Sequence, residues 1–394
     1  MNAIDKLSLR ETKWLRGAAE ANPEIPRVAR NRLRNPVGLP RFARNDSSIN
    51  VHLFMTFTII PKFLNPLIPK LRNMKSIVGF GALNLDLIYE VDDLRAISTS
   101  HFRLEPGKEL FGSGEEFQSL LNPLSRLGTL KSRSGGGSAA NTIAALARMG
   151  LSAKFIGKVG EDVEGDFLLE NLKPAQTDLI CRGGKSGVCL VVLDRHQDRF
   201  LFVSGNANST FKFDEIKLGE LKDISWIHLS SFIGEPPFEA QKALLNWIDA
   251  SMRVSLDPGE IYARKGLDKI RPLIERSHIL FLTEKEIRML THRDLFDGAK
   301  SLMEMGPSIL VCKKGSKGSH IFSKEKDFGV PAIPVEVVDN TGAGDVYNAG
   351  FLAGLFLGKS YEESAFFATK VAAKSVTGYG RDQYPNREDF FGLK

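Results

Sequence analysis

The sequence is poor in cysteine and histidine, and this scarcity argues against disulfide-stapled and zinc-centred classes of protein. Among 394 residues there are 3 cysteines and 7 histidines. Cys181, Cys189 and Cys312 are odd in number and lack the spacing of metal ligands, so they indicate reduced core residues in a cytoplasmic protein. The histidines are scattered, with no HExxH motif and no His/Cys cluster. A structural transition-metal site is therefore not expected.

Long apolar runs are also lacking. The run "VHLFMTFTIIP" is about ten residues long, whereas a helix that spans a bilayer needs ~20. It follows the arginine-rich "RVARNRLRNPVGLPRFARN", and no small-residue cleavage site is evident. Three interpretations of residues 1–73 stay open: a transit-type address, a membrane-surface arm, or a disordered extension from an over-long gene start. We favour the extension, because Met74 is followed at once by the strand-like "KSIVGFG".

The positive net charge does not belong to the body of the protein. The whole chain carries 53 basic and 47 acidic residues, a formal charge of +6. Residues 1–73 hold 13 of the basic and 5 of the acidic residues, which leaves 40 basic and 42 acidic residues beyond them. The remaining chain is therefore close to neutral, and it does not predict a nucleic-acid-binding surface.

Beyond this segment, short runs rich in valine and isoleucine alternate with helical patterns. This alternation predicts an α/β protein with a mostly parallel central sheet, flanked by helices on both faces, that binds ligands beyond the carboxyl ends of its strands. One expected strand, residues 335–338, precedes a helix that should begin near Asp345. Two segments, near 87–130 and 185–204, break the alternation, and we expect them to form a small β lid on a single domain, 74–394.

Two glycine-rich motifs look like nucleotide-binding loops but fail the tests for them. "GFGALN" follows a strand, yet Asn84 stands where a dinucleotide-binding fingerprint needs its third glycine, and no helix follows at once. "GGKS" ends like a Walker A loop, yet Leu179 replaces the first glycine. Any phosphate-binding site must therefore lie elsewhere in the sequence.

The stretch "VVDNTGAGDVYNAGF", residues 337–351, offers such a site. Gly342, Ala343 and Gly344 fall at the expected start of a helix, where unpaired N–H groups and the helix dipole attract an anion. Asp345 follows them and is placed to take a proton from an attacking hydroxyl group. An aspartate in a tight glycine turn can also be a simple helix cap. The position at the carboxyl end of an expected strand is what favours the phosphate interpretation.

Several motifs together resemble the signatures of the PfkB family of sugar and nucleoside kinases, which has the ribokinase-like fold. "DNTGAGD" is similar to its C-terminal signature, and "GGGSAANT" is similar to its N-terminal glycine signature. "GALNLD" resembles its sugar-binding turn, and "DRFLFVSGNAN", "SLDPG" and "KKGSKG" fit in order and spacing. The resemblance covers about residues 75–390 and implies a kinase that uses ATP and Mg²⁺.

The resemblance also implies a role for each matching residue. Asp345 would be the catalytic base, and the three small residues before it would form an anion hole for the transferring phosphoryl group. Glu286 would order Mg²⁺ through water, although Thr283 replaces the usual asparagine of that motif. In the same signature, Asn340 stands where a threonine is usual, whereas Asp339 and Thr341 match the family. These two matching residues imply that a monovalent cation can bind behind the anion hole. Acceptor binding would use Asn84, Asp86, Gly136, Gly137 and Asn141, and nucleotide binding would use Gly315, Gly318 and Thr341.

The class of acceptor stays open in the sequence. The Asn84-x-Asp86 pair resembles ribokinase and related sugar kinases, which favours a small sugar. The long segment from Val91 to Gly135 resembles the adenosine-kinase branch, which favours a nucleoside. A non-catalytic relative that only binds sugar or nucleotide is a third alternative, and the presence of Asp345 argues against it. The resemblance further implies a homodimer through the lid strands, while neither nucleic acid nor a membrane is an expected partner.

Overall fold

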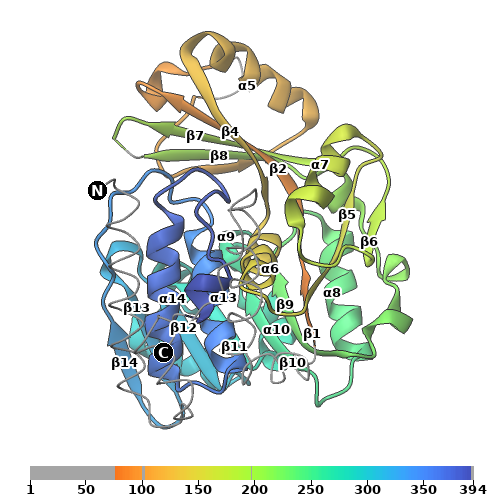
Figure 1. Cartoon of the computed structure of the whole chain (residues 1–394), viewed down its shortest axis with the longest axis vertical. Helices are drawn as coiled ribbons and strands as arrows, with labels where there is room; N and C mark the ends of the chain where they lie inside the picture. The colour runs from red at the N-terminus through yellow and green to blue at the C-terminus, as the bar shows by residue number, and fades with distance from the viewer. Residues whose placement is uncertain (1–75, 100–102, 197, 392–394) are drawn as a thin grey trace, which may run out of the picture. The chain divides into compact units, whose positions relative to one another are not determined.

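The computed structural model describes residues 76–99, 103–196 and 198–391. The N-terminal extension expected over residues 1–73 lies outside this part of the chain, so its three interpretations stay predictions. The described residues form two sheets, one of nine strands and one of five, together with the helices that cover them (Figure 1).

The larger sheet is mostly parallel, as predicted. Its strands are β1 (Ser76–Phe80), β5 (Ala153–Val159), β6 (Ile180–Arg182), β9 (Ile224–Ser230), β10 (Arg253–Asp257), β11 (Ile279–Thr283), β12 (Ile309–Lys313), β13 (Ser319–Ser323) and β14 (Asp327–Val330). They lie in the order β14-β13-β12-β11-β10-β9-β1-β5-β6. All pairs from β12 to β6 are parallel, whereas β13 pairs antiparallel with both β12 and β14.

The larger sheet is apolar on both faces, because successive side chains of a strand point to opposite sides. In β11, Ile279 and Phe281 pack on one face, whereas Leu280 and Leu282 pack on the other. Strands buried on both faces need such continuous apolar runs, which is why they could be located in the sequence. The first face is covered by α6 (Ser138–Arg148), α7 (Val163–Leu172), α13 (Ala343–Phe356), α14 (Tyr361–Ser375) and α15 (Arg387–Phe391), and the second by α8 (Glu235–Trp247), α9 (Gly259–Ala263), α10 (Leu267–Arg276), α11 (Glu284–Thr291) and α12 (Leu295–Met303). Among the described helices, none has the length and apolar character needed to cross a membrane.

The smaller sheet brings together the two segments that were predicted to form a β lid. Its strands and helix are β2 (Asn84–Val91), β3 (Glu109–Phe111), α5 (Gly114–Leu127), β4 (Gly128–Gly136), β7 (Gly187–Asp194) and β8 (Arg199–Ser204), and the strand order is β3-β8-β7-β2-β4. Helix α5 packs on one face of this sheet through Phe117, Leu120 and Leu124. Figure 1 shows the sheet and α5 together at the top of the view, with α5 on the outer side. The expected lid is therefore a sheet with its own helical cover.

One predicted strand does not form. Residues 335–338 follow β14 as an irregular and largely exposed segment. Pro331 and Pro334 lie just before it, and proline lacks the N–H group that a further strand would need for its ladder. The chain is fixed instead by the N–H groups of Val338 and Asp339, which donate to the carbonyl of the C-cap residue of α14 at 2.8 and 3.2 Å. The approach to α13 is thus a loop and not a strand.

Candidate active site

The N-terminus of α13 has the geometry of an anion-binding site. The helix begins at Ala343, two residues before the predicted start, with Gly342 as its N-cap. Gly342 has a φ of 77°, which glycine adopts without strain, and a Cβ placed on it would lie 2.6 Å from the hydroxyl of Tyr384. The N–H group of Gly344 has no hydrogen-bond partner among the described residues. This first turn is therefore open to an anion.

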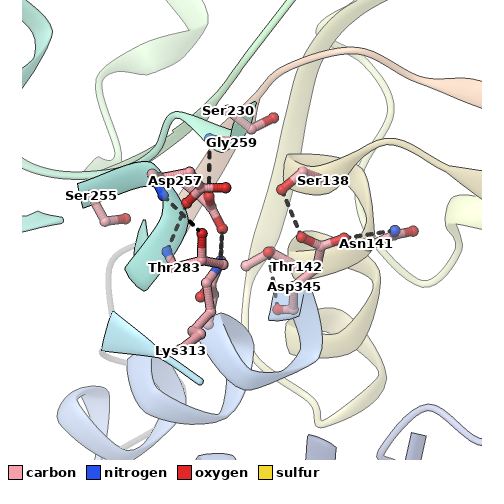
Figure 2. Close-up of polar contacts among 12 residues, drawn as sticks. Ser138, Asn141, Thr142, Ser230, Ser255, Asp257, Gly259, Thr283, Lys313 and Asp345 are labelled. Atoms are coloured by element: carbon pink, nitrogen blue, oxygen red, sulfur yellow. Dashed lines mark hydrogen bonds and ion pairs between the residues drawn. The ribbon is translucent and has the colours of Figure 1, made fainter. Parts of the chain in front are cut away.

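Asp345 is the third residue of α13, and its carboxylate is held by two hydrogen bonds. Its Oδ1 accepts from the hydroxyl of Ser138 at 2.7 Å, and its Oδ2 accepts from Nδ2 of Asn141 at 2.9 Å (Figure 2). Burial and then the nearby carboxylate of Asp257 raise the pKa of Asp345 to about 6, although Lys313 opposes them. At neutral pH the group is mostly ionised, yet it is basic enough to accept a proton.

Helix α6 supplies the partners of Asp345 from one of its faces. Ser138, Asn141 and Thr142 stand at positions i, i+3 and i+4, which lie on the same side of an α-helix. The hydroxyl of Thr142 donates to the carbonyl of Asp345 at 3.1 Å. The sequence analysis gave Ser138 and Thr142 no role, although their spacing from Asn141 within "GGGSAANT" was a signal for a shared face.

Asn141, which was predicted to bind the acceptor, is engaged at both ends of its amide. Its Nδ2 donates to Asp345, and its Oδ1 accepts from Nε of Arg381 at 3.1 Å. Arg381 is 2% exposed, and its Nη1 donates to the backbone and side-chain oxygens of Asn171, both at 3.2 Å. The Nη2 of Arg381 has no partner among the described residues. Asn141 thus lies against the expected base, and a buried guanidinium lies behind it.

The predicted acceptor residues Asn84 and Asp86 lie in the first residues of β2 and not in the turn that precedes it. Oδ1 of Asn84 accepts from Nδ2 of Asn208 at 2.9 Å, whereas Oδ1 of Asp86 has no partner among the described residues. Burial raises the pKa of Asp86 to about 8, although Arg381 opposes it, so the carboxyl group is mostly protonated at neutral pH. A protonated carboxyl group both donates and accepts, which suits the hydroxyl groups of an acceptor.

The two predicted glycines of this site lie directly against Asp86 and α6. Gly136 pairs with Asn84 across β4 and β2, and a Cβ placed on it would lie 2.1 Å from both carboxyl oxygens of Asp86. Only glycine permits so close an approach. Gly137 is the N-cap of α6. Gly136 is packed against Asp86, and Ser138, two positions further on, donates to Asp345, so the two carboxyl groups belong to one site.

The predicted nucleotide-binding residues lie on two loops. Gly315 opens the 3₁₀ turn Gly315–Lys317 directly after β12, and Gly318 is its C-cap. Thr341 precedes the N-cap of α13, where its N–H group donates to Oδ1 of Asp339 at 2.8 Å. The hydroxyl oxygen of Thr341 is buried and has no partner among the described residues. The loop with Thr341 leads directly into α13, and the loop with Gly315 begins just after Lys313, the last residue of β12, whose side chain approaches the first turn of α13.

A charged cluster lies between β10, β12 and α13, and Glu286 is the one member that the sequence predicted as a site residue. Lys313 forms an ion pair with Oδ2 of Asp257, the last residue of β10. The same oxygen accepts from Nδ2 of Asn348 at 2.6 Å. Burial and then the charge of Asp257 raise the pKa of Glu286, which belongs to the same cluster. The motifs "SLDPG" and "KKGSKG" contain the two ion-pair partners, but they are 56 positions apart, and neither motif alone shows that they meet.

The two acids of this cluster fit the chemistry of Mg²⁺. Glu286 forms a capping box with Thr283: its Oε2 accepts from the N–H of Thr283 at 2.7 Å, and Oγ1 of Thr283 accepts from the N–H of Glu286 at 3.3 Å. Thr283, the residue that departs from the usual asparagine, therefore orients Glu286 through the backbone. With Asp257, Glu286 provides hard carboxylate oxygens of the kind that Mg²⁺ prefers, directly or through water.

Comparison with known proteins identifies the family to which this chain is similar. Residues 122–387 match the family described as pfkB family carbohydrate kinase. The chain belongs to the pfkB family of carbohydrate kinases. An uncharacterized sugar kinase of Archaeoglobus fulgidus is 36% identical to it over 251 residues, which are 62% of this chain and 99% of that protein. The family resemblance inferred from the motifs is thus confirmed.

Solved structures confirm the ribokinase-like fold of this pfkB family member. Arabidopsis thaliana ribokinase, complexed with ribose and ATP, has a TM-score of 0.64 at 23% identity, over 81% of this chain and 98% of that chain. The adenosine kinase of Sinorhizobium meliloti has a TM-score of 0.70 at 20% identity, over 78% of this chain and 95% of that chain. Proteins named for a sugar and for a nucleoside therefore share this fold, and the fold alone does not choose between the two acceptors.

Proposed function

We propose that this pfkB family kinase transfers the γ-phosphoryl group of ATP to a hydroxyl group of a small sugar. The observation that carries the proposal is the position of Asp345. It lies in the first turn of α13, has a pKa raised to about 6, and is held by Ser138, which follows by two positions the glycine packed against Asp86. One site thus joins a base, an anion-binding helix terminus and a buried carboxyl group suited to hydroxyl groups.

In the proposed step, Asp345 accepts the proton of the acceptor hydroxyl while the hydroxyl oxygen attacks the γ-phosphorus of ATP. The new P–O bond joins the phosphoryl group to the sugar, the P–O bond to the β-phosphate breaks, and ADP leaves with the electron pair. Ser138 and Asn141 fix the orientation of the base. The N–H group of Gly344 and the dipole of α13 stabilise the charge on the transferring group.

Two ions belong to this proposal. Mg²⁺ neutralises phosphate charge when it is bound, and Glu286 would hold it through water with Asp257 beside it. The buried and unpartnered hydroxyl oxygen of Thr341 offers a ligand for a monovalent cation behind the anion hole. We expect EDTA to abolish ADP release and added Mg²⁺ to restore it, and we expect exchange of K⁺ for the bulky tetramethylammonium ion to lower the rate.

A sugar is the acceptor that the site supports best. Asp86 offers a donor and an acceptor in one buried group, and a sugar presents several neighbouring hydroxyl groups that match it. The alternative is a nucleoside, which the long segment from Val91 to Gly135 favours; in the structure this segment supplies β3, α5 and nearly all of β4. The choice between the two is an outcome of the experiment below.

The test is ADP release from ATP with a panel of sugars and nucleosides, measured for the wild type and for Asp345→Asn. We expect at least one free sugar to support turnover, and we expect the variant to fold and to be inactive. A nucleoside that is used better than every sugar would reassign the acceptor. Absence of ADP release with every acceptor, or unchanged turnover in Asp345→Asn, would contradict the proposed function.

We further propose a cytoplasmic location and a homodimer through the lid strands. All three cysteines are free; Cys189 and Cys312 are buried in the core as predicted, whereas Cys181 is half-buried. Free thiols suit a reducing compartment. In the smaller sheet, β3 and β4 are the edge strands and so have backbone groups available for pairing with a second copy. Light scattering of the purified protein would give the mass of a dimer if such pairing occurs and of a monomer if it does not.

A further inference from the structure

Lys313 occupies a position that its ion pair alone does not explain. It is the last residue of β12, its side chain is 13% exposed, and its ammonium group pairs with Oδ2 of Asp257. That oxygen also accepts a hydrogen bond from Asn348 at 2.6 Å, so Asp257 keeps a partner when the lysine is elsewhere. A buried ion pair adds little net stability over an apolar pair of similar size, so stability is a weak reason for this one.

The ammonium group of Lys313 lies over the first turn of α13. A Cβ placed on Gly344 would lie 3.3 Å from Nζ of Lys313, so the amine lies beside Gly344, whose N–H group has no partner among the described residues. Figure 2 shows Lys313 extending toward Asp257, with Asp345 nearby in the first turn of α13. The amine and the helix N-terminus therefore offer positive charge to the same small volume.

Lys313 carries a positive charge in its ion pair with Asp257, and its amine lies next to the first turn of α13, which also holds Asp345. A compact ammonium charge beside an open N–H group is the arrangement by which lysine binds phosphate as a point charge.

We propose that Lys313 exchanges its ion pair with Asp257 for one with the γ-phosphoryl group of ATP, and that it stays with this group during transfer. This inference rests on the proposed kinase function and adds to it a phosphate-contacting residue. Before ATP binds, Asp257 holds the amine in place. When ATP binds, Asn348 retains Asp257, and the released carboxylate faces the phosphates next to Glu286, where Mg²⁺ would bind.

The first experiment measures equilibrium binding of ATP and of ADP to the whole chain with Mg²⁺ and without an acceptor. We expect Lys313→Met to weaken ATP binding by about 10-fold to 100-fold, which corresponds to the loss of one charge-assisted contact. ADP binding should change by less than about threefold, because ADP lacks the γ-phosphoryl group. Lys222→Met, an exposed lysine just before the amino end of β9, serves as the matched control and should change neither affinity, because ligands bind at the carboxyl ends of the strands.

The second experiment separates this role from a structural one. In the double variant Asp257→Asn/Lys313→Met, no buried carboxylate is left unpaired, so the protein should fold even if Lys313→Met alone does not. Asp257→Asn alone is the reference, because Asp257 itself lies beside the expected Mg²⁺ site. If Lys313 only neutralised Asp257, the double variant would have the same ratio of ATP to ADP affinity as Asp257→Asn, and the inference would be overturned. We expect the ratio in the double variant to be about 10-fold or more below that of Asp257→Asn.

The outcomes also separate this inference from the function on which it rests. The ratio of ATP to ADP affinity is measured without an acceptor, so it does not depend on which sugar is used. An equal loss of ATP and ADP affinity in Lys313→Met, with turnover intact in the wild type, refutes the role of the lysine alone. A wild-type protein that binds ATP through Lys313 but releases no ADP with any acceptor refutes the proposed function alone.

Discussion

Nε of Arg381 donates a hydrogen bond to Oδ1 of Asn141 at 3.1 Å, and this contact decides which end of the Asn141 amide faces Asp345. With its oxygen turned toward the guanidinium, Asn141 must present its NH₂ group to the carboxylate, to which it donates at 2.9 Å. An amide turned the other way would place its oxygen against the carboxylate oxygen of Asp345, which is repulsive. Arg381 therefore acts on the catalytic base through a neighbour, as a positioning residue.

Arg381→Met should impair the base without removing it. The amide of Asn141 loses its anchor, and a positive charge near Asp345 disappears, so the pKa of Asp345 should rise further above its ordinary value. We expect kcat to fall at neutral pH and the acid limb of the pH–rate profile to move to higher pH, so that part of the activity returns when the pH is raised. The profile of kcat between pH 5 and 9 measures this shift.

The matched control for Arg381 is Arg148→Met. Arg148 donates to the carbonyl of Arg381 and does not contact Asn141, so its loss removes a neighbouring guanidinium without freeing the amide. If both variants lose activity to the same extent and with the same pH profile, Arg381 has only a structural role. A shifted profile in Arg381→Met alone supports the positioning role.

The wild-type rate should depend on the ionisation of Asp345. The base works only when it is deprotonated, so activity is lost as the pH falls through its pKa, which burial and Asp257 raise to about 6. We expect kcat to fall by about tenfold per pH unit well below 6 and to reach a plateau above about 7. Asp345→Asn should lower kcat by at least ~10²-fold on the plateau above about pH 7, the scale of a lost general base, and the difference should shrink as the pH falls below about 6. An acid limb near pH 4 in the wild type would contradict this environment for Asp345.

The parts of the fold and site that the sequence made predictable are local ones. Continuous apolar runs such as that of β11 identify buried strands, and "GAGD" identifies the start of a helix with the expected catalytic base in its first turn. Both features are set by residues that are neighbours along the chain. The prediction of a strand over residues 335–338 was wrong, and the reason is also local. Pro331 and Pro334 stand just before this segment, and they lack the N–H groups that a strand needs for its hydrogen-bond ladder.

The unpredicted parts of the site are long-range pairs. Arg381 and Asn141 are 240 positions apart, and Lys313 and Asp257 are 56 positions apart. Nothing in the residues around Arg381 distinguishes a surface arginine from a buried one, because its burial is set by strands and helices from other parts of the chain. Such partners emerge only when the order of the strands places their ends side by side.

The raised pKa of Asp86 should make stability depend on pH. The ordinary pKa of aspartate is near 3.8, whereas burial raises that of Asp86 to about 8, so between these values the folded state keeps a proton that the unfolded state has lost. The free energy of unfolding should therefore fall as the pH rises from about 4 to 8, by up to ~1.4 kcal/mol per pH unit from this group. Asp86→Asn should remove this part of the loss, which urea denaturation at pH 5, 7 and 9 would measure. Equal pH dependence in the variant and the wild type would show that Asp86 is ionised when folded.

Asp86 should also decide which acceptors are used. Its Oδ1 is buried without a partner among the described residues, and leaving such a group unsatisfied costs roughly 1–3 kcal/mol, so an acceptor that supplies a hydroxyl group gains that amount. Asp86→Ala should therefore raise KM for the acceptor by about 10-fold or more, while KM for ATP stays within about twofold. Deoxy analogues that lack one of two neighbouring hydroxyl groups should be poor substrates of the wild type.

The control for Asp86 is Asp92→Ala, an exposed aspartate just beyond the end of β2, which should leave both KM values unchanged. Asp86→Ala removes the protein partner of the contact between Asp86 and an acceptor hydroxyl group, and the deoxy analogue removes the acceptor partner. In Asp86→Ala the contact is already lost, so the deoxy analogue and its parent sugar should be used about equally, whereas the wild type should discriminate between them. If the wild type uses both equally and Asp86→Ala matches the wild type, the hydroxyl groups of the acceptor bind elsewhere, and the buried carboxyl group serves the packing of β2 against Gly136.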